Sequence, residues 1–159
     1  MTEVYIMSVM WKYLDKRSAA VAAIKDYDSM KFIIDTTADE IRSAYDSMSS
    51  ISGSKWDGMP GSHDPHAGEE RLVNLIDEID VLKERYRQAQ EYMDWFKPAW
   101  EQLSEDDRYI LETYYGDANN YGSSAVYYIA EFLHIEQPTV YKRKNRTLGR
   151  LTVLLFGKD

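Results

Sequence analysis

The residues best suited to chemistry in this chain are cations crowded near its carboxyl end. The stretch TVYKRKNRTLGRL, residues 139–151, contains five basic residues and no acidic one, in a protein of net charge −8. Residues 1–103 carry twelve Lys and Arg against nineteen Asp and Glu, residues 104–136 one against seven, and residues 137–159 six against one. An acidic body with one basic end predicts contact with a polyanion at a single place.

Apolar residues between these charges make the prediction more specific. In IAEFLHIEQPTVYKRKNRTLGRL, the HIEQ segment interrupts a helical pattern, and Pro138 suits the first turn of a following helix. Small or apolar residues stand where a helix-turn-helix buries its side chains: Ile129, Ala130, Leu133, Ile135, Val140, Leu148 and Leu151. The sequence therefore predicts two short helices joined by a tight turn, with the second helix in a DNA groove.

This segment resembles the helix-turn-helix of sigma-70 region 4, and LSEDDRYILETYY resembles the first helix of that module. The whole arrangement, with a long helical part and a GMPGS loop before the sigma-like end, is similar to phage and integrative-element regulators of the RinA and ArpU kind. The sequence departs from the sigma pattern at Glu136, where a capping Ser or Thr is usual, and at Thr147, which replaces Ala. The GDANNYGSS connection is also longer than the typical one.

The resemblance implies a role for each matching position. Gln137, Tyr141 and Lys142 match the base-facing positions, and Gln and Lys have the donors to read adenine and guanine in the major groove. Thr139 would meet a phosphate or a thymine methyl at the helix start. Arg143, Lys144, Arg146 and Arg150 spread around the helix and cannot all face one groove, so phosphate contacts are expected from Arg146 and some of the other three. Ser123 and Ser124, at the start of the preceding helix, are placed to hold a backbone phosphate.

Long helices must position this end of the chain. From about Ser8 to Met48 apolar residues recur in heptads, with Thr37 as a polar gap, and no Gly or Pro interrupts them. Residues 49–67 are rich in Gly, Pro, Ser and Asp, which predicts a loop. A second helix starting near Ala67 or Glu69 has a wholly apolar seam, and Pro98 predicts a kink or stop near Lys97. Two such helices predict a long antiparallel hairpin over residues 1–103.

The remaining residues, 104–159, are expected to form a separate DNA-binding domain. SEDD at residues 104–107 reads as a helix N-cap followed by acidic first-turn residues. The fold class predicted for the chain is therefore all-α: a helical hairpin followed by a sigma-70 region 4-like helix-turn-helix.

Other chemistries find little support in the sequence. With no cysteine, thiol catalysis and thiolate metal sites are excluded. His63, Asp64 and His66 in SHDPH form too small a set for a typical metal site, and acidic pairs such as Asp77/Glu78 lack a partnering pocket. We expect no catalytic residue, no metal and no cofactor. Without a membrane-length apolar run or a signal segment, a cytoplasmic location is expected.

The sequence thus predicts a sequence-specific transcription regulator that binds double-stranded DNA. The hairpin is expected to form a homo-oligomer, with a dimer favoured and Met93 and Phe96 as probes of its surface, or to contact RNA polymerase. Two alternatives stay open. One is a small terminase subunit, although such proteins more often place the DNA-binding part first. The other is a sigma mimic that binds proteins without reading DNA.

Overall fold

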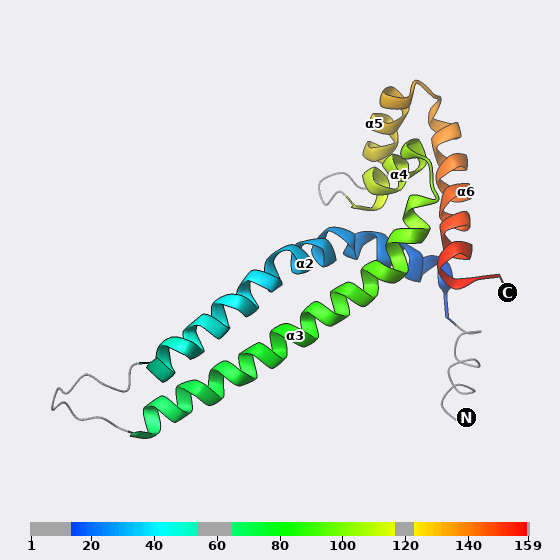
Figure 1. Cartoon of the computed structure of the whole chain (residues 1–159). Coiled ribbons are helices and arrows are strands. Elements are labelled where there is room, and N and C mark those ends of the chain that lie inside the picture. Colours follow the sequence, from blue (N-terminus) through cyan, green and yellow to red (C-terminus); the bar gives the residue numbers. More distant parts are fainter. Residues whose placement is uncertain (1–13, 54–64, 117–122, 159) are drawn as a thin grey trace, which may run out of the picture. The chain divides into compact units, whose positions relative to one another are not determined.

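The fold is all-α in every part of the chain that the structure describes. The computed structural model describes residues 14–53, 65–116 and 123–158, and of Ser52, Gly53, Pro65 and Ser123 only the backbone. Two long antiparallel helices, α2 (Lys16–Gly53) and α3 (Pro65–Glu101), come first (Figure 1). Three shorter helices follow, α4 (Glu105–Leu111), α5 (Ser123–Leu133) and α6 (Gln137–Phe156), with a π-helical segment η1 (Glu112–Gly116) directly after α4.

Helix α2 has a capped start and a buried seam. Asp15 accepts hydrogen bonds from the Ser18 amide (3.2 Å) and the Ser18 hydroxyl (2.7 Å), which lower the pKa of its carboxyl. The predicted heptad positions from Ala20 to Ile51 are all buried or half-buried. Thr37, the predicted polar gap, is fully buried, and no described residue hydrogen-bonds its hydroxyl. The expected first turns near Ser8 and Tyr13 lie outside the described residues.

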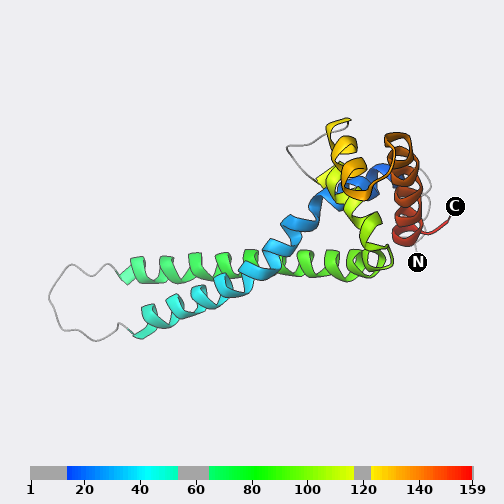
Figure 2. The same ribbon diagram turned by 90° about the horizontal axis from the view of Figure 1, so that it is seen from above.

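Helix α3 confirms the cleaner of the two predicted seams. Its ten predicted positions are all buried or half-buried: Leu72, Leu75, Ile79, Leu82, Tyr86, Ala89, Met93, Phe96, Trp100 and Leu103, the last just beyond the helix end. Figure 2 shows α2 and α3 as paired long helices, and Lys83 of α3 places its Nζ 5.3 Å from the centre of the Tyr45 ring of α2. An apolar stripe on each helix drives this pairing.

The boundaries of the long helices differ in part from those predicted. Of the kink or stop predicted near Lys97, the stop does not occur, because α3 continues through Pro98 to Glu101. Proline removes only the hydrogen bond to the Asp94 carbonyl, and buried Ala99 and Trp100 hold the last turn in place. The predicted loop 49–67 is also shorter, because α2 extends to Gly53 and α3 begins at Pro65. The GMPGS segment lies outside the described residues.

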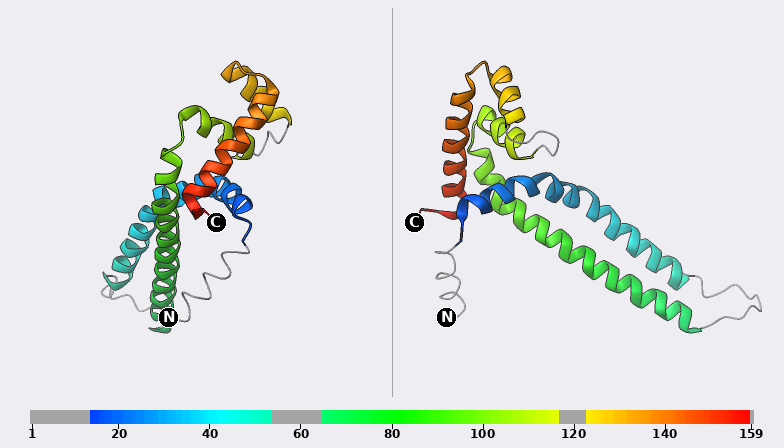
Figure 3. Two further views of the ribbon diagram at one scale, coloured as in Figure 1. Left: turned by 90° about the vertical axis from the view of Figure 1, so that its right-hand side faces the viewer. Right: turned by 180° about the vertical axis from the view of Figure 1, so that it is seen from behind.

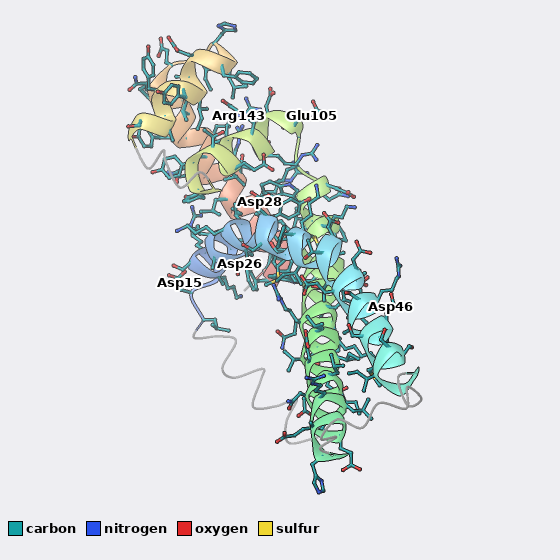
Figure 4. The ribbon with its side chains drawn as sticks, turned by 90° about the vertical axis from the view of Figure 1, so that its left-hand side faces the viewer. Asp15, Asp26, Asp28, Asp46, Glu105 and Arg143 are labelled. Atoms are coloured by element: carbon teal, nitrogen blue, oxygen red, sulfur yellow. The ribbon has the colours of Figure 1, made fainter. Side chains whose placement is uncertain are left out.

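The two long helices are acidic on their solvent-facing sides. Between residues 28 and 93 the described residues include twelve Asp and Glu side chains, all exposed, against six Lys and Arg. Asp28 and Asp46 are labelled among the side chains of α2 in Figure 4. On α3, hydrogen bonds from Arg87 and Gln88 lower the pKa of Glu84 to about 2. Such a surface repels other polyanions.

The chain divides into two compact units. One unit contains residues 28–93, and the other contains residues 1–27 together with 94–159. In the second unit Phe96 stacks on Trp100, with ring centroids 5.4 Å apart, and also contacts Tyr27 at 5.6 Å. Phe96 is 0% exposed. It therefore belongs to an internal core and is unsuitable as a probe of an association surface.

In the described ranges, we find no helix with both the length and the apolar character needed to cross a bilayer.

Candidate nucleic-acid interface

The short helices are built around one small apolar core. Ser104 caps α4 by accepting a hydrogen bond from the Asp107 amide at 3.2 Å, which confirms the predicted cap. Ile110 of α4, Val126 and Ile129 of α5 and Val140 of α6 form the buried centre. Tyr109, Tyr114, Ala130, Leu133 and Ile135 pack around it. All seven residues predicted to be buried between Ile129 and Leu151 are buried or half-buried.

A tight turn connects α5 to α6 (Figure 3). The Ile135 amide donates to the Ala130 carbonyl at 3.1 Å, and the His134 amide donates to the Glu131 carbonyl at 3.4 Å. This pair of bonds defines a Schellman motif, which requires a left-handed residue at its corner. His134 fills that corner with φ 54°, a conformation that favours glycine. The half-buried Ile135 then anchors the turn to the core.

Helix α6 starts without a side-chain cap. Glu136 occupies the N-cap position in an extended conformation, but its carboxylate makes no capping hydrogen bond. The backbone carbonyl of Glu136 accepts from the amides of Thr139 and Val140 at 3.0 and 3.1 Å. Pro138 lies in the first turn as predicted, where its missing N–H removes no helical hydrogen bond.

Four of the predicted DNA-contacting residues form one stripe along α6. Thr139, Lys142, Arg146 and Arg150 follow each other at intervals of three or four residues, and all are exposed. Residues at these intervals lie on one face of a helix. No salt bridge within residues 14–53, 65–116 and 123–158 involves any of the three cations. We call these four residues the basic stripe; from Thr139 to Arg150 it is about 16 Å long.

The predicted base-reading residues lie at the amino-terminal part of the same helix. Gln137 and Tyr141 are exposed and one turn apart, and Lys142 belongs to the basic stripe. Ser124 is exposed in the first turn of α5. The backbone of Ser123 begins α5, and its side chain lies outside the described part of the structure.

Arg143 is engaged inside the protein. Its Nε donates to the Asp107 carboxylate at 2.8 Å, and its Nη2 lies 3.8 Å from the Asp106 carboxylate. Figure 4 labels Arg143 near the first turn of α4, where Glu105 is also labelled. With its side chain only 25% exposed, Arg143 ties α6 to α4 and has less freedom to reach a phosphate than the stripe residues.

Lys144 is also turned inward. It is 8% exposed, and its Nζ lies 4.0 Å from the centre of the Tyr114 ring, with the Tyr115 and Tyr141 rings at 5.8 and 5.6 Å. The π-helical segment brings Tyr114 and Tyr115 to this position, and burial raises the pKa of the Tyr115 phenol. Lys144 thus makes cation–π contacts with an aromatic cluster that includes one predicted base reader.

Arg17 is a further cation next to the basic stripe, and it was not among the residues predicted from the sequence. The Nη2 of Arg17, in the first turn of α2, donates to the Asn145 carbonyl of α6 at 3.4 Å, across 128 residues of sequence. A Cβ atom at Gly149 would lie 3.4 Å from the Arg17 Nη1, so the exposed guanidinium lies beside the middle of α6. No local sequence pattern signals this contact, because it depends on how α2 packs against α6.

The described residues contain no group of three or more His, Asp or Glu side chains arranged to hold a metal ion, and His63 and Asp64 lie outside those residues. Comparison with known proteins adds no further guide to the site. No protein-family model, curated protein or solved structure matches the chain significantly.

Proposed function

We propose that this protein is a sequence-specific, double-stranded DNA-binding regulator of transcription, of the phage or integrative-element kind. In this proposal α5, the turn at His134 and α6 act as a helix-turn-helix, and α6 enters the major groove. The observation that carries the proposal is the basic stripe. Its three exposed cations make no salt bridge in the described part of the chain, although the protein as a whole is acidic.

The roles divide along α6. Gln137, Tyr141 and Lys142, near the helix start, supply contacts to base edges, whereas Arg146 and Arg150 contact phosphates. Arg17 adds a phosphate contact beside the stripe. Three or four such contacts give a salt dependence of about −3 for log K against log salt, which is modest for a DNA-binding protein. We therefore propose a homodimer, or assistance from RNA polymerase, for binding at physiological salt.

The test begins with selection of bound sites from a random DNA pool, followed by titration of the selected and random duplexes at several salt concentrations. Lys142→Ala and Gln137→Ala should relax sequence preference, by about 1 to 3 kcal/mol of discrimination. Arg146→Ala should weaken binding to every sequence and reduce the salt slope by about 1. Equal losses on selected and random DNA for all three variants would refute the assignment of base readers.

Two control variants sharpen this experiment. Lys31→Ala removes one exposed cation from α2 in the other compact unit and should change neither affinity nor slope. Lys144→Met removes a cation that faces the Tyr114 ring, so the salt slope should stay at its original value. A drop of about 1 in the slope for Lys144→Met would show instead that this lysine reaches a phosphate.

The alternative of a sigma mimic that binds only proteins has one observation in its favour: two of the five cations of residues 139–151 are engaged internally. The low-salt titration separates the two functions. Absence of binding to any duplex at low salt would leave the protein-binding alternative. Ring-sized assemblies in sedimentation would instead favour the alternative of a small terminase subunit.

A further inference from the structure

Helix α5 exposes a face that neither the core nor the basic stripe uses. Ser124, Tyr127, Tyr128 and Glu131 follow each other at helical spacing and are all exposed, and Phe132 borders them. Tyr127, Tyr128 and Phe132 are 50%, 51% and 64% exposed. Single exposed aromatic residues are ordinary, but three on one face of an eleven-residue helix form a contiguous apolar surface.

The neighbouring helix α4 extends this surface. The Tyr109 ring packs on Phe132 with centroids 4.4 Å apart, and exposed Glu105 lies one turn before Tyr109 on the same side of α4. Within α5, the Tyr127 hydroxyl donates to the Glu131 carboxylate at 2.9 Å, and this bond raises the pKa of the tyrosine. The aromatic–acidic patch therefore consists of Tyr109, Tyr127, Tyr128, Phe132, Glu105 and Glu131.

The charge of the patch distinguishes it from the basic stripe of α6. Helix α5 contains no Lys or Arg. The one base of α4, Arg108, is half-buried with its Nε shielded from solvent. Aromatic faces and carboxylates both attract guanidinium groups, the faces by cation–π contact and the carboxylates by paired hydrogen bonds. The same carboxylates disfavour a nucleic-acid backbone.

We propose that the aromatic–acidic patch is a docking site for a partner protein that presents Arg side chains beside aliphatic ones. The aliphatic groups cover Phe132 and Tyr109, and the guanidinium groups lie over Tyr127 or Tyr128 and pair with Glu131 and Glu105. Aromatic residues and arginine are the groups that dominate binding energy at protein interfaces. This docking does not depend on DNA binding by α6, since the patch and the basic stripe share no residue.

The test uses two synthetic peptides and the whole 159-residue chain. One peptide is an amphipathic helix with Arg and Leu at helical spacing; the other replaces each Arg by Glu. Because a basic peptide can adhere to any acidic surface, binding must be located on the protein. We expect the backbone amide NMR signals of α5 and the first turns of α4 to shift with the Arg peptide only. Shifts concentrated on residues 28–93 would overturn the proposal.

Matched variants give a second readout. Phe132→Ala and Glu131→Arg should each lower the affinity for the Arg peptide by about tenfold. Glu70→Arg makes the same charge change at an exposed position of α3 and should change this affinity by less than twofold. Glu131→Arg removes no buried group, so it remains informative if Phe132→Ala unfolds. Equal binding by Glu131→Arg, Glu70→Arg and the original protein, or no binding at all, would refute a docking site.

The same variants also test whether a second copy of the chain or DNA occupies the patch instead. If Glu131→Arg or Phe132→Ala lowers the sedimentation mass of the protein alone, a second copy covers the patch and the proposed partner is wrong. If Phe132→Ala weakens DNA binding as much as Arg146→Ala does, the aromatic residues serve DNA and the proposal fails. Loss of DNA binding by Arg146→Ala alone, with peptide binding intact, concerns only the proposed function.

Discussion

His134 shows how one residue limits the stability of the turn between α5 and α6. Its left-handed backbone, with φ 54°, costs an ordinary residue about 1 kcal/mol relative to glycine. The Schellman bonds from the amides of His134 and Ile135 hold it there. Neither hydrogen bond involves the imidazole, so a substitution of the side chain leaves both bonds in place.

We therefore expect His134→Gly to raise the free energy of unfolding by up to about 1 kcal/mol. Urea denaturation followed by circular dichroism measures the change. His134→Ala keeps a Cβ atom in the same backbone conformation and should give no such gain. Equal stability of the alanine and glycine variants would show that the corner residue is unstrained.

Thr37 has a buried hydroxyl with no hydrogen-bond partner among the described residues. This hydroxyl is enclosed in the helical seam. Thr37→Val has nearly the same shape and should stabilise the protein by about 1 kcal/mol in thermal or urea unfolding. Thr36→Val is the control, because the Thr36 hydroxyl donates to the Phe32 carbonyl at 2.9 Å. A loss of stability in Thr37→Val would show that its hydroxyl has a partner.

At the scale of single elements, α6 begins without a side-chain cap. Glu136 is at the N-cap, but its longer side chain makes no capping bond. The shorter aspartate side chain can accept a hydrogen bond from the backbone amide three residues later, and it keeps the same charge. Because Pro138 has no N–H, the aspartate carboxylate would share the Thr139 amide, which already donates to the Glu136 carbonyl at 3.0 Å.

Glu136→Asp should accordingly stabilise the protein by about 0.5 kcal/mol, the low end for a cap, because it adds a second acceptor to an amide that is already bonded. It should also slow hydrogen exchange in the first turn of α6, while DNA affinity changes little because charge is conserved. Glu136→Gln, which cannot cap as well, is the comparison. Faster exchange at Thr139 in the aspartate variant would contradict this account of the helix start.

The sequence predicted the helices and their buried seams better than the contacts between helices. Heptads located both seams, and Ser104 and Pro138 located two helix starts, because these signals are local. The inward turn of Lys144 also had a signal, since it lies four residues from both Val140 and Leu148 on the buried face. The pairing of Arg143 with Asp107 and the position of Arg17 had none, because they depend on tertiary packing.

At the scale of the molecule, the predicted self-association through the hairpin is still to be tested. Its described seam positions are buried or half-buried, so a second copy would have to bind through other apolar residues. Between residues 28 and 93, Val81 and Phe32 are 67% and 61% exposed. They are better probes than Phe96, whose substitution would disrupt the internal core.

If residues 28–93 provide the dimer contact, Val81→Lys or Phe32→Lys should shift the protein from dimer to monomer in sedimentation over a range of concentrations. Gln90→Lys adds the same charge at an exposed polar position of α3 and should leave the mass unchanged. An original protein that is monomeric at every concentration would refute association through the hairpin. The DNA titration would then be expected to show one protein per site.

The division of the chain at residues 28 and 93 has a consequence for the length of the two long helices. The 28–93 segment begins within α2 and ends within α3. Just outside it, Tyr27 of α2 and Phe96 of α3 contact each other in the core of the other unit. The 28–93 segment therefore leaves and rejoins the other unit at neighbouring points. Deleting one heptad from each long helix preserves the seam register and the core that holds α6. Variants of different hairpin length should thus keep the same basic stripe, whereas deletion of residues 1–103 would remove part of its support.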